Sequence, residues 1–199
     1  MLRRWLVLLY LGSLLTALPA LAEPAHQLLA GEATVVNPRY LLIGPEGQAI
    51  SDQDFRGRFQ LIAFGYTYCP DICPTTLVDM AELLKQLGPD AERVQGIFIS
   101  VDPERDTPRV LKTYTAFFDA RILGLSGTQE LVQRAARNYR VRYAKVGGKD
   151  AKNYAVDHSA GLYLLNPDGQ FLKKFAYGRP VDEILAELRG FLGSIQTLH

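Results

Sequence analysis

Apolar residues follow two different periodicities along the chain, and the alternation between them predicts strands separated by helices. The runs 59–66 and 94–101 are almost continuously apolar, which is typical of strands buried on both faces of a sheet. After Thr75 the apolar residues recur every three or four positions, which predicts an amphipathic helix. Thr107 and Pro108 offer a capping residue and a first-turn proline, so a second helix is expected to begin there.

The second half of the chain predicts one more helix and then a closing hairpin. Residues 129–139 have helical spacing, and Asn166-Pro167-Asp168-Gly169 is a strong turn signal between two strand-like runs. The other expected elements are strands at 39–43, 122–125, 141–146, 161–165 and 171–175, and a last helix marked by apolar positions between Val181 and Leu192.

Turn residues at 44–48 predict an antiparallel hairpin near the start of the domain, followed by a loop at 51–57. The order of strand, cysteine-containing turn, helix, strand, helix, hairpin and helix is that of a thioredoxin-like fold. We therefore expect an α/β protein with a mixed central sheet, helices on both faces and an N-terminal hairpin extension.

The first 22 residues have the pattern of a targeting segment. A short basic start precedes an apolar run from Trp5 to Leu18, and Pro19-Ala20-Leu21-Ala22 supplies the small residues of a cleavage site. We expect a signal peptide at 1–22, a leader at 23–38 and one domain at 39–199. The alternative is an uncleaved membrane anchor through residues 5–22, and in both cases the domain lies outside the cytoplasm, in the periplasm or at the outer face of the inner membrane.

Charge excludes some classes of partner. The formal net charge is +1, and removal of residues 1–22 with Arg3 and Arg4 leaves 20 basic against 21 acidic residues. No excess of either sign indicates binding to nucleic acid.

The candidate chemistry is concentrated in two cysteines, Cys69 and Cys73, which lie between a predicted strand and a predicted helix. The exposed N–H groups and dipole of a helix start favour thiolate over thiol. In an oxidising compartment the default is one structural disulfide, but a bond that closes so small a loop constrains little of the unfolded chain and is expected to be strained. We therefore interpret the pair as a metal-binding or redox pair.

Two thiolates do not complete a metal site, so a third ligand is expected from elsewhere. Of the three histidines, His26 lies in the leader and His199 is the last residue, whereas His158 lies just ahead of a predicted strand. In a thioredoxin-like fold that place faces the cysteine turn. Sulfur and imidazole suit both copper and zinc, and the spacing does not separate the two metals.

Three motifs resemble the Sco/SenC family of copper-binding thioredoxin-fold proteins. They are GYTYCPDICP at 65–74, SVDPERDT at 100–107 and VDHS at 156–159, and the hairpin 162–169 matches as well. The resemblance covers roughly residues 35–192. It implies one copper ion per chain, Cu(I) or Cu(II), held by Cys69, Cys73 and His158.

Four aspartates within these three motifs are further candidates. Asp102 and Asp106 are expected either to form a docking surface or metal-entry patch, or only to lead into the next helix. Asp157 is a candidate to orient His158, and Asp71 is a candidate outer group of the site. The alternative for both is an ordinary loop or turn residue.

The resemblance implies a copper chaperone rather than an enzyme, with the binuclear copper centre of cytochrome c oxidase subunit II, or another copper-accepting protein, as its partner. Reduction of the partner's cysteines is an additional activity that the thiol pair permits. The alternative is a thiol–disulfide oxidoreductase or thiol peroxidase. Such proteins typically separate their cysteines by two residues and keep a cis-proline, and residues 147–166 contain no proline.

Overall fold

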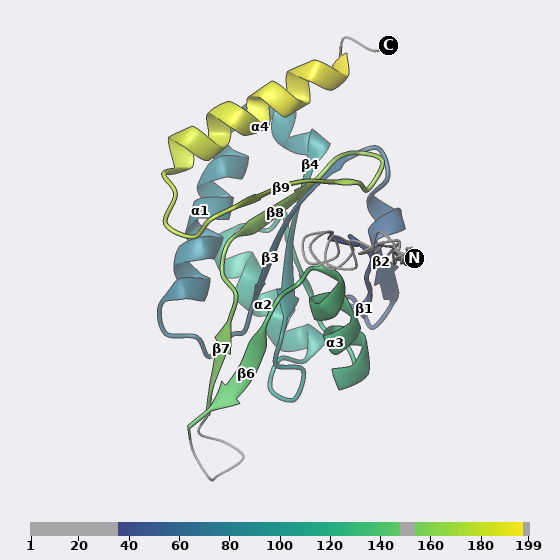
Figure 1. The fold of residues 1–199 in the computed structure, drawn as a ribbon, viewed down its shortest axis with the longest axis vertical. Coiled ribbons are helices and arrows are strands. Elements are labelled where there is room, and N and C mark those ends of the chain that lie inside the picture. The colour runs from purple at the N-terminus through teal and green to yellow at the C-terminus, as the bar shows by residue number, and fades with distance from the viewer. Residues whose placement is uncertain (1–35, 148–153, 197–199) are drawn as a thin grey trace, which may run out of the picture. The chain divides into compact units, whose positions relative to one another are not determined.

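The computed structural model describes residues 36–147 and 154–196, which belong to one compact unit. Its centre is a five-stranded sheet in the order β5-β4-β3-β8-β9 (Figure 1). The strands are β3 (Phe59–Gly65), β4 (Val94–Ser100), β5 (Ile122–Leu125), β8 (Leu162–Leu165) and β9 (Phe171–Phe175). The first three are parallel, and β8 and β9 are antiparallel to their neighbours. The predicted mixed sheet is confirmed.

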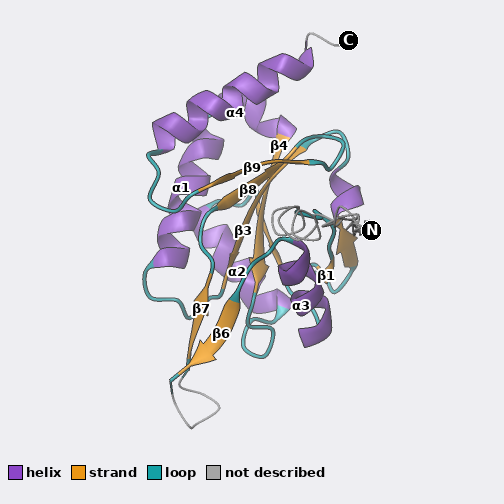
Figure 2. Ribbon diagram, in the orientation of Figure 1, coloured by secondary structure: helices purple, strands orange, loops and turns teal. Residues whose placement is uncertain are grey.

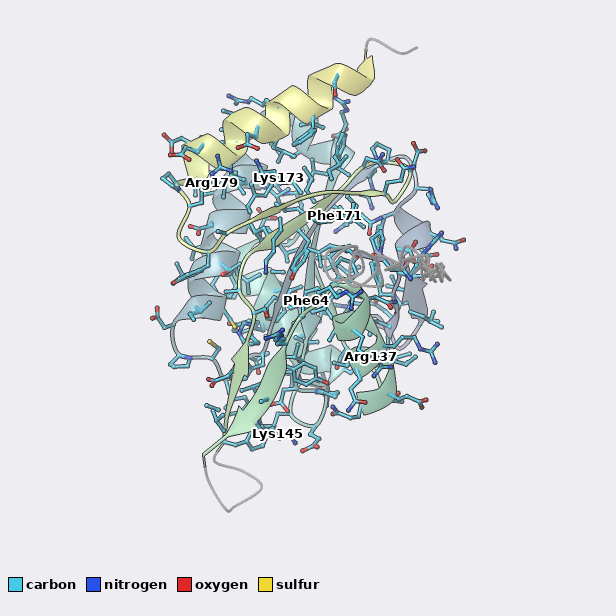
Figure 3. All side chains as sticks on the ribbon, in the orientation of Figure 1. Phe64, Arg137, Lys145, Phe171, Lys173 and Arg179 are labelled. Atoms are coloured by element: carbon cyan, nitrogen blue, oxygen red, sulfur yellow. The ribbon has the colours of Figure 1, made fainter. Side chains whose placement is uncertain are left out.

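Helices cover both faces of this sheet (Figure 2). They are α1 (Ile72–Gln86), α2 (Pro108–Phe118), α3 (Gln129–Asn138) and α4 (Val181–Gln196). A Cβ atom on Gly96 would meet Met80 of α1, and one on Gly124 would meet Leu111 of α2, so both helices pack on the same face. On the other face, the Phe64 ring (labelled in Figure 3) has its centroid 5.2 Å from that of Tyr139, which directly follows α3.

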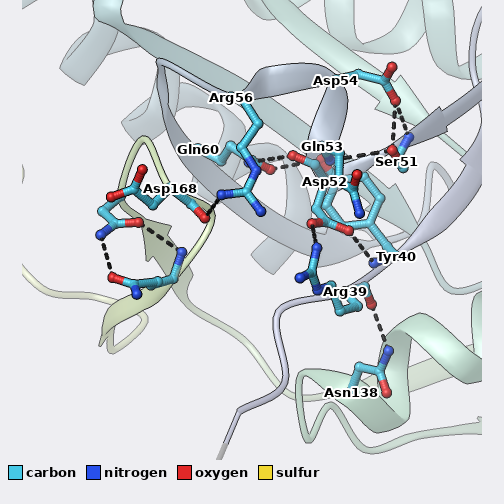
Figure 4. Close-up of polar contacts among 12 residues, drawn as sticks. Arg39, Tyr40, Ser51, Asp52, Gln53, Asp54, Arg56, Gln60, Asn138 and Asp168 are labelled. Atoms are coloured by element: carbon cyan, nitrogen blue, oxygen red, sulfur yellow. Dashed lines mark hydrogen bonds and ion pairs between the residues drawn. The ribbon is translucent and has the colours of Figure 1, made fainter.

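The N-terminal hairpin consists of β1 (Leu41–Ile43) and β2 (Ala49–Ser51), which pair antiparallel as predicted. A buried carboxylate, Asp52, attaches it to the rest of the chain: it accepts a 2.7 Å hydrogen bond from Arg39, and its backbone carbonyl accepts one from Gln60 (Figure 4). The side-chain amide of Asn138, the last residue of α3, donates to the carbonyl of Arg39. The hairpin is therefore an integral part of the domain.

Several boundaries differ from the sequence prediction. The first helix begins at Ile72 rather than Thr75, so Cys73 lies inside its first turn. The predicted loop at 51–57 contains the 3-10 helix η1 (Asp52–Phe55), and a second one, η2 (Gly88–Arg93), follows α1. The strand β7 (Ala155–His158) was not predicted; it pairs with β6 (Tyr143–Val146) in a separate two-stranded ribbon.

The expected signal peptide or anchor lies outside the described residues, as does most of the leader. Residues 36–38 of the leader are described, and there the Asn37 N–H donates a 3.0 Å hydrogen bond to the carbonyl of Asn138. Within the described part of the chain, no helix combines the length and apolarity needed to cross a membrane.

Candidate metal centre

The cysteine turn connects the end of β3 to the start of α1. Cys69 lies in the turn and is half-buried, whereas Cys73 in the first turn of α1 is 1% exposed. The last residue of β3 is a glycine for a steric reason: a Cβ atom on Gly65 would lie 2.7 Å from Cys73 Sγ and 2.8 Å from the ring of Phe98. The strand can therefore pass directly beneath the sulfur.

The third group reaches the site from the β6–β7 ribbon. His158 is the last residue of β7 and pairs with Tyr143 of β6. Its Nε2 atom lies 3.2 Å from Cys73 Sγ, and its Nδ1 atom lies 3.3 Å from the carbonyl oxygen of Ser159. A proton on Nδ1 donates to that carbonyl, which leaves the Nε2 lone pair directed at the sulfurs.

The two sulfurs of Cys69 and Cys73 and one ring nitrogen of His158 all lie within 4.8 Å of one another. The structure thus brings together the three residues that the sequence analysis selected as ligands. Both cysteines are free thiols. Two soft sulfurs and one imidazole are a donor set for Cu(I), Cu(II) or zinc, and a soft ion of low coordination number needs no further protein ligand.

Burial shapes the electrostatics of the site, and it corrects one expectation. Desolvation raises the pKa of the Cys73 thiol well above its ordinary value, although a hydrogen bond with the Tyr66 backbone favours the thiolate. The predicted helix-start stabilisation of the Cys73 thiolate is therefore wrong: the loss of water outweighs it. Desolvation also lowers the pKa of His158. Both groups are held neutral, so a bound cation has to supply the charge that converts thiol to thiolate.

Asp106 anchors the cysteine turn from below. Its carboxylate is fully buried and accepts hydrogen bonds from the Thr67 N–H (3.0 Å), the Thr67 hydroxyl (2.5 Å) and the Ser100 hydroxyl (2.6 Å). Burial raises its pKa, and these three bonds partly offset that effect. A carboxylate without exposed surface cannot form a docking patch, so that interpretation of Asp106 is wrong, and the helix cap is instead Thr107, which accepts from the Val110 N–H.

Asp102 is also fully buried, which excludes it from a docking surface too. It forms an ion pair with Arg105 and accepts a 2.6 Å hydrogen bond from the Tyr154 hydroxyl. The Arg105 guanidinium lies over three aromatic rings, at 5.6 Å from Tyr66, 4.7 Å from Tyr68 and 3.7 Å from Tyr154.

Arg105 therefore joins the two halves of the site. Tyr66 and Tyr68 belong to the cysteine turn, and Tyr154 precedes β7, the strand that carries His158. Arg105 also donates a 3.0 Å hydrogen bond to the Tyr154 carbonyl. Arg105 was not among the site residues predicted from the sequence. The signal for it was its place in the SVDPERDT motif, between Asp102 and Asp106, which were predicted.

The two remaining acidic candidates are exposed and do not touch the three donor atoms. Asp71 occupies the N-cap position of α1, where its side chain makes no capping hydrogen bond. Asp157 is adjacent to His158 in β7, and alternation along a strand sends the two side chains to opposite faces. The Ser159 carbonyl, not Asp157, is the hydrogen-bond partner of the His158 ring.

Fold and site together define the class as thioredoxin-like proteins that place two thiols and one imidazole around a single point. No peptide bond among the described residues is cis. The SCO1/SenC family model matches residues 30–193. The chain belongs to the SCO1/SenC family.

Individual relatives agree with this assignment. The mitochondrial SCO2 homologue of Mus musculus is 38% identical over 169 residues, covering 84% of this chain and 66% of the relative. The copper-bound structure of Bradyrhizobium japonicum ScoI is 41% identical with a TM-score of 0.72, covering 79% of this chain and 99% of that one. The chain spans about two thirds of the length of the mammalian relatives it matches, 64–66%.

A second solved structure connects the family to cytochrome c oxidase assembly. BsSco, described as a member of the Sco family of cytochrome c oxidase assembly proteins with a disulfide switch, is 28% identical with a TM-score of 0.60, covering 76% of this chain and 90% of that one. These similarities confirm the predicted thioredoxin-like fold.

Proposed function

We propose that this protein is a copper chaperone that binds one Cu(I) ion through Cys69, Cys73 and His158. The observation that carries the proposal is the convergence of two sulfurs and one ring nitrogen within 4.8 Å, from segments 85 residues apart in sequence. The copper-bound state of the Bradyrhizobium relative supports copper over zinc.

Delivery proceeds by ligand exchange and leaves the copper oxidation state unchanged. Cys69 is the more exposed sulfur, so an incoming thiolate of an acceptor reaches the ion from that side. Each acceptor thiol that binds copper releases a proton, and each released donor thiolate takes one up. The raised pKa of the Cys73 thiol favours that uptake and so assists release.

The acceptor that we propose is the binuclear copper centre of cytochrome c oxidase subunit II, with the domain exported or anchored outside the cytoplasm. The description of BsSco as an oxidase assembly protein supports the acceptor. The apolar run from Trp5 to Leu18 supports the location.

The test is a titration of the reduced protein with Cu(I) against a competing chelator. We expect about one tightly bound equivalent per chain. We expect a large loss of Cu(I) affinity in each of three variants, Cys69→Ser, Cys73→Ser and His158→Ala. Loss of a residue that only hydrogen-bonds to a metal ligand costs roughly 10–100-fold in affinity, and loss of a ligand itself should cost at least as much. His199→Ala is the matched control. Undiminished affinity in His158→Ala would refute the three-donor site.

A second candidate function is reduction of the acceptor's disulfide, and the unequal exposure of the two cysteines favours it. The half-exposed Cys69 attacks the disulfide as a thiolate and one acceptor thiolate leaves; Cys73 then attacks Cys69, which frees the second acceptor thiolate. Two electrons pass from the Cys69–Cys73 pair to the acceptor. This activity is expected to survive His158→Ala and to disappear in Cys69→Ser.

A further inference from the structure

A basic surface of the domain lies on α3 and β6. Between Gln129 and Gly147 the sequence has five basic residues and one acidic residue, in a chain whose formal net charge is only +1. We call Arg134, Arg137, Arg142 and Lys145 the basic face, and all four are exposed. Figure 3 shows Arg137 on α3 and Lys145 on β6.

Three members of the basic face lack a neutralising partner. Some exposed basic side chains elsewhere pair with carboxylates, as Lys85 does with Glu82 and Lys112 with Glu46. Within 36–147 and 154–196, no carboxylate lies within ion-pair distance of Arg134, Arg137 or Arg142; Lys145 pairs with Glu104. These guanidinium groups can bind an anionic group of a partner without first breaking an ion pair within the protein.

The basic face borders a groove that leads to the candidate metal centre. One hollow of about 470 Å³ lies between α3 and β6, with Ala136 and Val141 in its lining and Arg137 at its side. A second hollow of about 340 Å³ is lined by His158 and by the exposed Asp157, and it shares Arg142, Tyr143 and Ala144 with the first. The surface that carries the charge is thus continuous with the surface around the imidazole.

This inference rests on the proposed function, because copper transfer requires a partner protein to contact this surface. An acceptor thiolate has to approach the ion to within bonding distance, so the acceptor protein must cover the surface around His158. For a weak, transient complex, charge complementarity decides both the encounter rate and the choice of partner. We propose that the basic face docks an acidic protein surface that lies beside the acceptor's metal-binding cysteines.

The shape and chemistry of the basic face favour a protein over a lipid surface. Guanidinium groups form paired hydrogen bonds with carboxylates as well as with phosphates, and three of the four basic residues are arginines, so the charge by itself suits either anion. The hollow is shallow and open, and its exposed lining surface is more apolar than polar, which fits the side chains of a protein partner better than a layer of charged head groups.

The test uses three synthetic acceptor peptides, each with two cysteines flanked by glutamates, glutamines or lysines. Cu(I) transfer from the full-length wild-type protein is followed by stopped flow at low and high salt. We expect the glutamate peptide to be loaded roughly ten times faster than the lysine peptide at low salt, and the difference to vanish at high salt.

The variant that tests the basic face is Arg137→Glu/Arg142→Glu, which is expected to abolish or reverse the preference while Cu(I) affinity is kept. Arg134→Glu/Arg137→Glu, with both changes on α3, replaces it if affinity changes. The matched control is Lys85→Glu/Arg189→Glu, which changes the net charge by the same amount as the basic-face variant. Lys85 lies near the end of α1 that is far from Cys73, and Arg189 lies on α4. The control is expected to keep the wild-type preference.

Three results would overturn the inference: no preference in the wild type, an unchanged preference in the basic-face variant, or an equal loss in the control. Binding to phosphatidylcholine vesicles only when phosphatidylglycerol is present, without peptide preference, would assign the face to a membrane instead. Failure of the wild type to bind Cu(I) refutes the copper chaperone itself. Equal transfer to all three peptides refutes only the basic face.

Discussion

Asp106 is the residue whose replacement tests the architecture of the cysteine turn most directly. Its buried carboxylate accepts three hydrogen bonds, two of them from Thr67, which lies two residues before Cys69. Asp106→Ala leaves the Ser100 hydroxyl and the Thr67 N–H without acceptors, at about 1–3 kcal/mol for each buried donor. We therefore expect the free energy of unfolding to fall by about 2–6 kcal/mol, the sum for the two donors.

Asp106→Asn is expected to behave differently. The asparagine carbonyl can accept from the Thr67 N–H and the Ser100 hydroxyl, and its amide can donate to the Thr67 hydroxyl after that proton rotates. The substitution also removes a charge that is unfavourable in a buried site. We expect its stability at neutral pH to lie within about 1 kcal/mol of the wild type.

The pH dependence gives the sharper readout. Because the pKa of Asp106 is raised in the folded state, the folded protein binds this proton more tightly than the unfolded chain does. The stability that Asp106 contributes by binding this proton is fully present below the pKa of the unfolded chain, near 4. It is lost as the pH rises through the pKa of the folded state. The free energy of unfolding of the wild type, minus that of Asp106→Asn, should therefore increase as the pH is lowered.

The assay is urea unfolding of the reduced, metal-free proteins between about pH 4 and pH 7, followed by circular dichroism. Titration of all other groups is common to both proteins and cancels in the difference. A difference in free energy of unfolding that does not change with pH would refute a raised pKa of Asp106. So would a wild type that loses stability relative to Asp106→Asn on acidification. Equal destabilisation by asparagine and alanine would refute the proposed exchange of hydrogen bonds.

Three further predictions concern the candidate metal centre. Gly65→Ala places a Cβ atom 2.7 Å from Cys73 Sγ and should lower Cu(I) affinity in the chelator competition, whereas Gly190→Ala, with open space around it, should not; equal affinities would contradict the close approach. Tyr154→Phe removes the hydrogen bond to Asp102, and it should reduce Cu(I) affinity roughly 10–100-fold and stability by about 1 kcal/mol. Unchanged affinity would show that Arg105 and Asp102 hold β7 in place without this hydrogen bond. In the metal-free protein iodoacetamide should modify Cys69 well before Cys73, because Cys73 is buried and its thiol pKa is raised; mass spectrometry that finds Cys73 modified first would contradict that burial.

Local patterns were enough to predict most elements of the fold. The apolar runs located β3 and β4, the Thr107-Pro108 pair marked the start of α2, and Asn166 to Gly169 marked the turn between β8 and β9. These features depend on short-range propensity and periodicity, which the sequence records directly. β7 was missed because it pairs only with β6 in a ribbon outside the main sheet, and four residues are too few for a clear alternation.

The sequence by itself determined which atoms are available for chemistry: two thiols, one well-placed imidazole and two nearby aspartates. Tertiary structure alone decided what surrounds them. Burial removed water from Cys73 and His158 and reversed the charge state expected of a helix-start thiol, and it enclosed Asp102 and Asp106 beneath the turn. Desolvation depends on what packs around a group from distant parts of the chain, and for that reason no local pattern reports it.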